Sequence, residues 1–473
     1  MKKTSITLAL TAALAAFAST NVHAAGYRFG SQSVASQGNA DANAAEANDA
    51  SVQFYNPAGL SRLNGTQIQV GGTVVAPHSS YTDEGSTRFT GTSTGGQNPS
   101  DRIVPKAVLA PSVYFSTQLN DRWTFGTGLY VPYGTKMDYG NQWAGRYALN
   151  KIELESVALN PSVAYKIDAH QSIGFGVSAE YMKAKLSQSV DVPGTVAALS
   201  GTATGNALIQ QIAALGGNPA VLAAVKDGSG KNDGHGWGYG ANIGYLYQLD
   251  AGTRFGLAYR SPVRHKLDGS TVWDFSTVTT DPIVNQVLAA ASGKANSDAR
   301  VRLTTPETVS ANAFHQIDAR WSVMGDVTWT RTSRLQELHI EFPGTKEGDE
   351  VIRQYWKNTW RVSVGADYKI NDQFLLRMGY AFDQSPVRDS TLTHPALPDG
   401  NRNTLSAGLN IKLNEQSSLD LAYSFTMLQD VQGNYKNACS PVATTCTGNG
   451  ETTKGLYQTH LQMLGLAYNY RFF

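Results

Sequence analysis

Two cysteines, Cys439 and Cys446, are the first residues of this 473-residue sequence whose type and spacing could support chemistry. They lie in a segment rich in Gly, Thr and Asn. In an exported chain they could form a disulfide that closes a small loop. Their spacing also resembles half of a metal site, but no second pair follows and no His lies between them. The pattern favours a disulfide over a metal site, and neither interpretation carries a function.

Catalytic signals are the next candidates. The H-E-x-x-H zinc motif and the phosphate-binding P-loop are both absent from the sequence. The nine histidines are scattered singly along the chain, and a lone His on a strand or loop is usually solvated. The sequence therefore predicts no catalytic residue, no metal and no cofactor.

The N-terminus has the pattern of an export signal. Lys2 and Lys3 precede a short apolar run over 6–17, and Val22-His23-Ala24 offers a cleavage site, so residues 1–24 are assigned to a signal peptide. The run is too short to cross a bilayer, and no later stretch approaches the roughly 20 apolar residues that a membrane helix requires. Any structure that crosses a membrane must therefore be built from strands.

The composition fits such a structure. A mean hydropathy of −0.28 accompanies 46 Gly, 22 Tyr and 16 Phe. Membrane strands alternate lipid-facing apolar residues with polar lumen-facing ones, which lowers the average hydropathy. The net charge is +1 and no basic patch with interleaved aromatics occurs, so no nucleic-acid partner is expected.

Strict alternation of apolar and polar residues recurs from about residue 66 onward. In 405–413, for example, every odd-numbered residue is apolar and every even-numbered one is small or polar. Short polar turns such as Asn371-Asp372 join some segments and long excursions join others, as in barrels with short periplasmic turns and long outer loops. The count is about fourteen strands: 66–77, 106–117, 122–133, 153–167, 171–187, 236–249, 252–264, 300–316, 321–329, 357–370, 373–383, 405–413, 419–427 and 464–472.

The fold class predicted is thus all-β, an antiparallel transmembrane β-barrel over 66–473. A soluble β-sandwich or propeller is the alternative. The C-terminus favours the barrel, because Leu464, Leu466, Tyr468, Tyr470 and Phe472 alternate with small or polar residues to the end of the chain. Such a terminal strand is typical of outer-membrane proteins, so the predicted location is the bacterial outer membrane.

Residues 25–65 lack this alternation and are rich in Ala, Asn, Ser, Asp and Gln. A disordered N-terminal tail is one interpretation. A barrel of about fourteen strands, however, has a lumen wide enough to need filling. We therefore predict that 25–65 forms a plug, or hatch, inside the barrel.

Two long excursions carry apolar residues at helical spacing. In 193–230, Asn218-Pro219 has the pattern of a helix start, and in 274–299 Asp281-Pro282 has the same pattern. The two sets of apolar residues can pack against each other, and they can form a hydrophobic groove where an oily ligand lands; we expect both together. The candidate groove residues are Leu208, Ile209, Ile212, Leu215, Val221, Leu222, Val225, Ile283, Val284, Val287 and Leu288.

A series of short motifs over the whole mature chain resembles the FadL-type long-chain fatty acid transporters. The hatch motif Asn56-Pro57-Ala58 is followed by 131–134 (Val-Pro-Tyr-Gly), and the later matches lie at 143–147, 159–165, 237–240, 259–261 and 382–387. The resemblance implies a fourteen-stranded barrel with a hatch, an external groove on two helical loops, and a ligand that leaves sideways where the third strand kinks inward.

The residues themselves favour the kink. Pro132 has no N–H for a strand ladder, and Gly134 eases a bend. The predicted lateral gate is Val131, Pro132, Tyr133 and Gly134. Alternatively, Pro132 simply ends the strand before a long loop.

A fatty acid also carries a carboxylate, which needs a cationic partner when its head is buried. The resemblance places this role at the end of the fifth strand, on Lys183 and Lys185, and in the ninth strand near His339 and Arg334. A His there would make the charge depend on pH. Lys183 and Lys185 could equally be rim cations that face lipopolysaccharide phosphates.

The sequence and the resemblance together predict a monomeric, passive outer-membrane channel for long-chain fatty acids, with membrane lipid and lipopolysaccharide as its surroundings. An uptake channel for aromatic hydrocarbons is the main alternative. A general porin and an outer-membrane lipid hydrolase are the remaining ones.

Overall fold

The computed structural model describes residues 28–98, 103–104, 107–345, 348–437 and 450–472. The predicted signal peptide, Cys439 and Cys446 lie outside these ranges.

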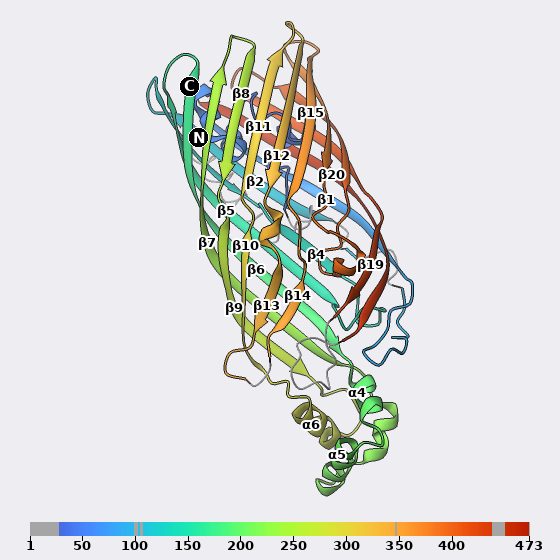
Figure 1. The fold of residues 1–473 in the computed structure, drawn as a ribbon. Helices are drawn as coiled ribbons and strands as arrows, with labels where there is room; N and C mark the ends of the chain where they lie inside the picture. The colour runs from blue at the N-terminus through green and yellow to red at the C-terminus, as the bar shows by residue number, and fades with distance from the viewer. Residues whose placement is uncertain (1–27, 99–102, 105–106, 346–347, 438–449, 473) are drawn as a thin grey trace.

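One antiparallel sheet of 20 strand segments forms most of the molecule (Figure 1). The segments are β1 (Thr66–Asp83), β2 (Val108–Gln118), β3 (Trp123–Tyr130), β4 (Gly134–Asp138), β5 (Lys151–Lys166), β6 (Gln171–Val190), β7 (Gly228–Gln248), β8 (Thr253–Arg260), β9 (Val263–Asp274), β10 (Ser297–Thr305), β11 (Thr308–Gln316), β12 (Trp321–Thr330), β13 (Glu337–Glu341), β14 (Glu350–Arg353), β15 (Thr359–Lys369), β16 (Phe374–Asp383), β17 (Arg402–Lys412), β18 (Ser417–Leu428), β19 (Val431–Lys436) and β20 (Thr452–Phe472).

These segments form fourteen strands, because six of the strands are interrupted and appear as two segments each: β3/β4, β8/β9, β10/β11, β12/β13, β14/β15 and β18/β19. The first strand pairs with the last over the whole length of β1, from Thr66 opposite Phe472 to Asp83 opposite Gly455. The sheet is therefore closed into a barrel with no free edge at this seam, and the predicted fourteen-stranded barrel is confirmed.

Alternation along each strand decides which side chains face outward. In β20, Leu464, Leu466 and Tyr468 are 61%, 55% and 42% exposed, whereas Met463 and Ala467 are buried. Successive side chains of a strand point to opposite faces, so the exposed apolar set forms the outer surface of the barrel. No helix within the described ranges is both long and apolar enough to cross a bilayer.

Residues 28–65, called the hatch below, run through the barrel interior and contain α2 (Val34–Gly38), α3 (Val52–Tyr55) and η2 (Pro57–Arg62). Side-chain amides tie them to different parts of the wall. Gln37 Nε2 donates to the Met463 carbonyl of β20 at 3.2 Å, and Asn39 Nδ2 donates to Asp367 Oδ1 of β15 at 2.8 Å. The polar, small-residue composition of this segment suits a lumen lined by polar side chains.

Lumen-facing glycines let the hatch approach the wall closely. A Cβ at Gly174 of β6 would overlap the peptide between Pro57 and Ala58, and a Cβ at Gly244 of β7 would overlap the Asn56 carboxamide. Asn56 also caps η2 by accepting from Ala58 N, and its Nδ2 donates to the Tyr245 carbonyl at 3.0 Å. The Asn-Pro-Ala motif is thus the point at which the hatch is fastened to β6 and β7.

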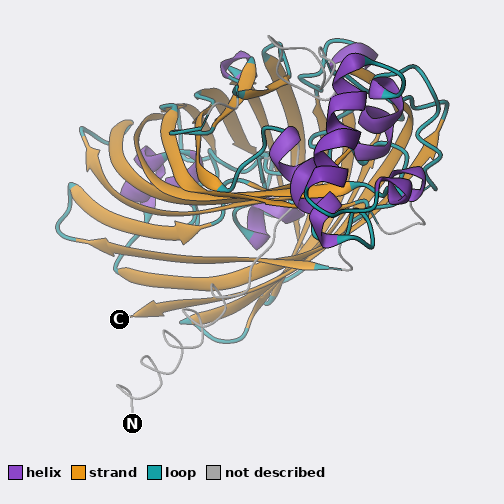
Figure 2. Ribbon diagram, turned by 90° about the horizontal axis from the view of Figure 1, so that it is seen from below, coloured by secondary structure: helices purple, strands orange, loops and turns teal. Residues whose placement is uncertain are grey.

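The two ends of the barrel differ. Short turns close the end that holds the C-terminus, and the long loops leave from the opposite end, which carries α4 (Val192–Leu199), α5 (Ala203–Ala214), η3 (Pro219–Ala224) and α6 (Pro282–Ala291) (Figure 1). Figure 2 shows these helices gathered over one side of the long-loop end. The two remaining short helices are η4 (Thr332–Arg334) and η5 (Ser390–Leu392).

Candidate functional site

The third barrel strand is interrupted at Val131–Tyr133. β3 ends at Tyr130, opposite Ala158, and the strand resumes as β4, with Gly134 opposite Glu155. Pro132 therefore interrupts the strand and does not end it. Val131, Pro132, Tyr133 and Gly134 are all buried, so this stretch turns toward the lumen.

The interruption leaves the ladder incomplete on the side of β2. β2 pairs with β3 from Val113 to Gln118, but among the described residues its Val108–Ser112 stretch has no ladder partner in β3 or β4. β4 pairs with β5 alone. A strand edge inside an otherwise closed barrel is unusual, because closure normally removes edges. We call this place the lateral opening.

The N-terminal part of the hatch occupies the backbone positions that the interruption frees. Phe29 N donates to the Pro132 carbonyl at 2.8 Å, and Gln32 Nε2 donates to the Val131 carbonyl at 2.8 Å. Arg28 forms an antiparallel bridge with Tyr133. The hatch and the kinked strand are thus one hydrogen-bonded unit, and movement of either requires these bonds to break.

An apolar cluster fills the lateral opening on the lumen side. The Phe29 ring, 3% exposed, packs with Val108 and Ala110 of β2 and with Val131. Val75 and Met463 complete the cluster. Phe29, called the stopper below, therefore fills the opening. The sequence did not indicate this position, because only the fold brings residue 29 to the third strand.

A second feature is an apolar cavity inside the long-loop half of the barrel. It encloses about 90 Å³, measured as the space open to the centre of a water molecule. Its wall is mostly aliphatic, with Thr135, Lys185, Asn232 and Asp233 as its polar residues; the larger aliphatic side chains are Ile152, Leu154, Leu186, Leu267, Val301, Leu303, Leu335, Leu338, Ile340, Ile352 and Leu397. An enclosed apolar wall of this kind suits an alkyl chain.

The loop 384–401 folds into the lumen and supplies part of this wall. Ala396 and Leu397 line the cavity. His394 is 2% exposed, its Nδ1 accepts from Ala396 N at 3.0 Å, and burial lowers its pKa to about 3. An acceptor nitrogen and a low pKa both describe a neutral imidazole, so this loop is held in place by an uncharged His.

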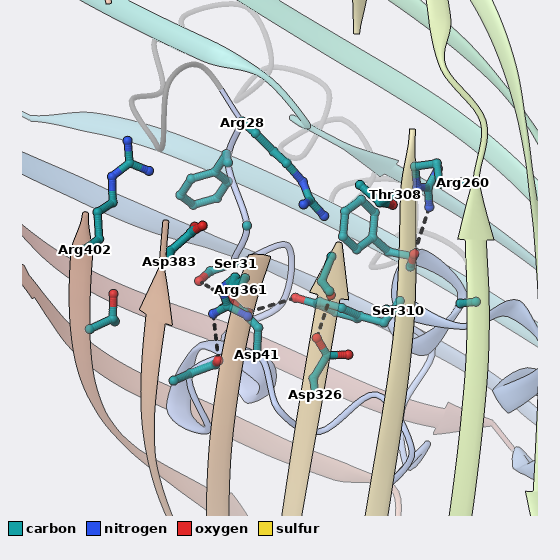
Figure 3. A pocket seen from close by; sticks show the side chains of 18 of the residues that line it. Arg28, Ser31, Asp41, Arg260, Thr308, Ser310, Asp326, Arg361, Asp383 and Arg402 are labelled. Atoms are coloured by element: carbon teal, nitrogen blue, oxygen red, sulfur yellow. Dashed lines mark hydrogen bonds and ion pairs between the residues drawn. The ribbon is translucent and has the colours of Figure 1, made fainter. Parts of the chain in front are cut away.

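A second cavity, called the hatch cavity below, lies between the hatch and the wall, as Figure 3 shows. It is lined by four guanidinium groups, those of Arg28, Arg260, Arg361 and Arg402, and by three carboxylates, those of Asp41, Asp326 and Asp383. The sequence did not indicate these residues as a site, since they come from the hatch and from five separate strands. Arg260 and Asp383 lie in motifs of the resemblance, at 259–261 and 382–387, but the resemblance gave them no role.

The helical loops pack largely as the first of the two interpretations predicted. Ile212, Val284, Val287 and Leu288 are buried in a cluster with the barrel-rim residues Trp273, Phe275, Ile340 and Phe342. Leu208, Val221, Leu222, Val225 and Ile283 are half-buried. Ile209 and Leu215 stay exposed, at 44% and 58%. The predicted caps are present: Asn218 accepts from Ala220 N, and Asp281 accepts from Ile283 N.

The residues predicted to meet a ligand carboxylate lie on the outer face of the barrel or are already paired, although Lys185 also lines the apolar cavity. Lys183 and Lys185 share the outward face of β6 with Ile173, Phe175 and Val177, which are 44–50% exposed. This placement fits rim cations. His339 is also exposed, beside Glu337 at 3.1 Å. Arg334 donates twice to Glu307, at 2.8 Å each.

One serine sits at the G-x-S-x-G spacing of hydrolase nucleophiles, in Gly91-Thr92-Ser93-Thr94-Gly95. In hydrolases that motif turns from a strand into a helix beneath the nucleophile. Here Ser93 is exposed in the loop between β1 and β2, and its Oγ accepts from Gly95 N at 3.2 Å. This local turn does not have the geometry of a nucleophile elbow.

A comparison with known proteins shows which proteins this chain resembles. The family model described as "Outer membrane protein transport protein (OMPP1/FadL/TodX)" matches residues 15–472. An outer membrane protein of Neisseria meningitidis serogroup B is 34% identical, with 97% of each chain covered. The long-chain fatty acid transport protein of Escherichia coli K12 is 27% identical over 92% of this chain and 94% of that protein.

Solved structures share the fold. The crystal structure of a FadL homologue of Pseudomonas aeruginosa has a TM-score of 0.80 at 23% identity and covers 95% of this chain and 100% of that one. The toluene transporter TodX of Pseudomonas putida has a TM-score of 0.61 at 20% identity, with 88% and 92% covered.

Proposed function

This chain belongs to the outer membrane protein transport family (OMPP1/FadL/TodX), and we propose that it is a passive channel that carries long-chain fatty acids from outside the cell into the outer membrane. As a member of the family it is an outer-membrane transporter of hydrophobic compounds. The choice of fatty acid, the capture site and the route are the proposal. The channel works as a monomer, without a cofactor and without an energy source.

The lateral opening is the main observation that supports this proposal. Between β2 and β4 the barrel lacks a ladder, the exposed backbone is bonded to the hatch, and an aromatic stopper fills the space. A hydrophilic solute would gain nothing from leaving through the side of the barrel into lipid. An apolar ligand gains about 0.8 kcal/mol for each methylene that it keeps away from water. A side exit therefore suits an oily cargo.

The cavities support a route to this opening. The apolar cavity shares Thr135 and Leu397 with a smaller cavity near Met137 and Leu428. That smaller cavity shares Arg402 and Leu461 with the hatch cavity, which Phe29 also lines. A ligand that moves down this series passes from an apolar wall to the stopper at the lateral opening.

Capture is assigned to the helical loops at the long-loop end. Ile209 and Leu215 expose apolar surface there, above the buried cluster of α5 and α6. Isolated apolar side chains on a surface are common, so these two residues alone would bind the ligand only weakly. The stronger binding site of the proposal is the apolar cavity in the lumen.

Aromatic hydrocarbons are the second candidate, and the likeness to the toluene transporter TodX favours them. A hydrocarbon has no charge, so it needs only the apolar cavity and the lateral opening. A fatty acid needs, in addition, a place for its carboxylate. A general porin is disfavoured by the hatch, whose residues fill the lumen and bond to the wall.

The test is oleate uptake by a Gram-negative strain that lacks its own fatty acid transporter and carries this gene. We expect growth on oleate to be restored, with the barrel present in the outer membrane. Uptake of toluene without oleate would assign the channel to hydrocarbons. Large, steady ion currents through the purified protein in planar bilayers would instead indicate a porin.

A further inference from the structure

The hatch cavity holds a set of charges that apolar transport does not explain. It encloses about 130 Å³, measured as for the apolar cavity, and is lined by the hatch and by the barrel wall (Figure 3). Arginine side chains are costly to bring out of water unless they are paired. Four of them around one cavity therefore call for a partner.

Two of the four guanidinium groups have a carboxylate partner within the protein. Arg361 Nη2 lies 3.1 Å from Asp41 Oδ2, and Arg402 is paired with Asp399. Arg28 and Arg260 form no ion pair with any carboxylate in the part of the chain that the structure describes. The cavity thus has two cations whose charge is not met by a direct carboxylate contact.

Strand register places these two cations at one level of the lumen. Arg260 stands opposite Thr308 in β11, and Thr308 stands opposite Thr330 in β12. Residues directly opposite each other point to the same face. Arg28 of the hatch donates from Nη1 to Thr330 Oγ1 at 3.2 Å. Arg28 and Arg260 therefore flank Thr308, and Figure 3 shows both guanidinium groups turned toward this part of the cavity.

The Arg260 guanidinium is fixed in place by contacts that leave donors free. Nη2 donates to the Phe54 carbonyl at 2.8 Å, Nη1 donates to Tyr130 Oη at 3.1 Å, and the group lies 4.7 Å from the centre of the Phe54 ring. A guanidinium has five N–H donors, so three remain. A positioned guanidinium with free donors suits a carboxylate, which it can bind through two parallel hydrogen bonds.

Two carboxylates also line the cavity without an ion pair. Asp326 accepts from Thr328 Oγ1 at 2.6 Å and from Asn312 Nδ2 at 3.3 Å, so hydrogen-bond donors of its own side of the wall satisfy it. Asp383 stands opposite Arg402 across β16 and β17. Asp399 pairs with Arg402 from outside the cavity lining, so the four arginines and the four carboxylates balance in number, and Arg28 and Arg260 remain the two cations without a direct carboxylate contact.

We propose that Arg28, Arg260 and Thr308 form a transit site for the carboxylate of an amphipathic ligand, which the ligand occupies just before it leaves through the lateral opening. The site rests on the proposed function and specifies its substrate class. Arg28 also bridges Tyr133 and precedes the stopper Phe29. A headgroup bound here lies beside the hatch segment that must move for the ligand to leave.

The test compares two probes that share one chain, oleate and methyl oleate, in the strain described above. The variants are Arg28→Gln with Arg260→Gln, and Arg260→Lys, which keeps the charge. The matched control is Lys183→Gln with Lys266→Gln, which also removes two cations, but exposed ones that do not line the cavities described here. Migration of the folded barrel in unheated SDS gels reports that each variant is assembled.

We expect the double Arg variant to lower oleate uptake about tenfold or more, the factor expected for loss of a charge-assisted hydrogen bond, and to leave methyl oleate uptake unchanged. Arg260→Lys should recover part of the oleate uptake, and the Lys control should match the wild type. An equal loss for both probes would indicate a structural role and overturn the site. Unchanged oleate uptake would overturn it as well. A wild-type protein that moves toluene but no oleate would instead refute the proposed function.

Discussion

Replacement of the stopper, Phe29→Ala, should loosen the lateral opening. The ring is almost wholly buried among Val108, Ala110 and Val131, while the backbone N–H of residue 29 bonds to the Pro132 carbonyl. The substitution removes the ring and leaves the backbone bond available. The hatch tip then has less to hold it against the kinked strand.

The size of the effect follows from burial. Truncation of a buried Phe to Ala usually costs about 3–5 kcal/mol. Some of this cost is recovered because neighbouring side chains relax into the space. If about 3 kcal/mol falls on the docked state of the hatch tip, the ratio of undocked to docked states rises about a hundredfold.

Hydrogen exchange of the purified protein in detergent measures this ratio. Backbone amides of residues 29–32 should exchange up to about a hundred times faster in Phe29→Ala than in the wild type, whereas amides around Asn56 should not change. Phe255→Ala is the matched control, because Phe255 lies on the outward face and is 48% exposed. Equal exchange rates in Phe29→Ala and the wild type would refute the stopper role.

Three further changes probe other parts of the route. Asn56→Ala removes the cap of η2 and the hydrogen bond to the Tyr245 carbonyl. The docked hatch should lose about 1–2 kcal/mol of stability and become more sensitive to protease. Unchanged digestion would contradict the fastening role of Asn56. Leu397→Trp, at the boundary between the apolar cavity and the next one, should lower oleate uptake about tenfold while leaving the amount of assembled barrel unchanged; unaffected uptake would exclude this passage. The pKa of His394 is lowered to about 3 in the folded loop, so the unfolded loop binds more protons between pH values of about 3 and about 6.5. Protection of residues 394–397 from hydrogen exchange should therefore be full above about pH 6.5 and fall as the pH drops below it. This fall in protection should be smaller in His394→Asn.

Much of the fold could be predicted from local pattern. Alternation in segments such as 405–413 located the strands, and Pro132 with Gly134 marked the interruption of the third strand. The other interruptions were missed, although Pro262 and Pro306 lie within two of them. A Pro that starts a bend and a Pro that merely sits at a strand end look alike in sequence, because the difference depends on whether the strand resumes.

The orientation of Lys183 and Lys185 could have been read from the sequence. They have the same parity as Ile173, Phe175 and Val177 on one strand, and that apolar set faces outward. The resemblance assigned them to a ligand carboxylate, with rim cations as the alternative. Parity along the strand is a direct physical constraint on which face of the barrel a side chain occupies.

The placement of Arg28 and Arg260 around one cavity could not be predicted from the sequence. Arg28 bonds to a residue 302 positions away, and nothing local to either arginine indicates this contact. The hatch finds its place through packing against glycines such as Gly174 and Gly244 on distant strands. Long-range placement of this kind depends on the closed barrel as a whole.

Passage through the side of the barrel is tested most directly by restoring the missing ladder. Pro132→Val with Gly134→Val supplies a backbone N–H and two β-branched residues in place of the kink. The measurement is oleate uptake by cells, with oleate binding by the purified protein as its companion. Loss of uptake with binding retained is the predicted result. Wild-type uptake by a variant whose third strand is continuous would show that the ligand leaves by another path.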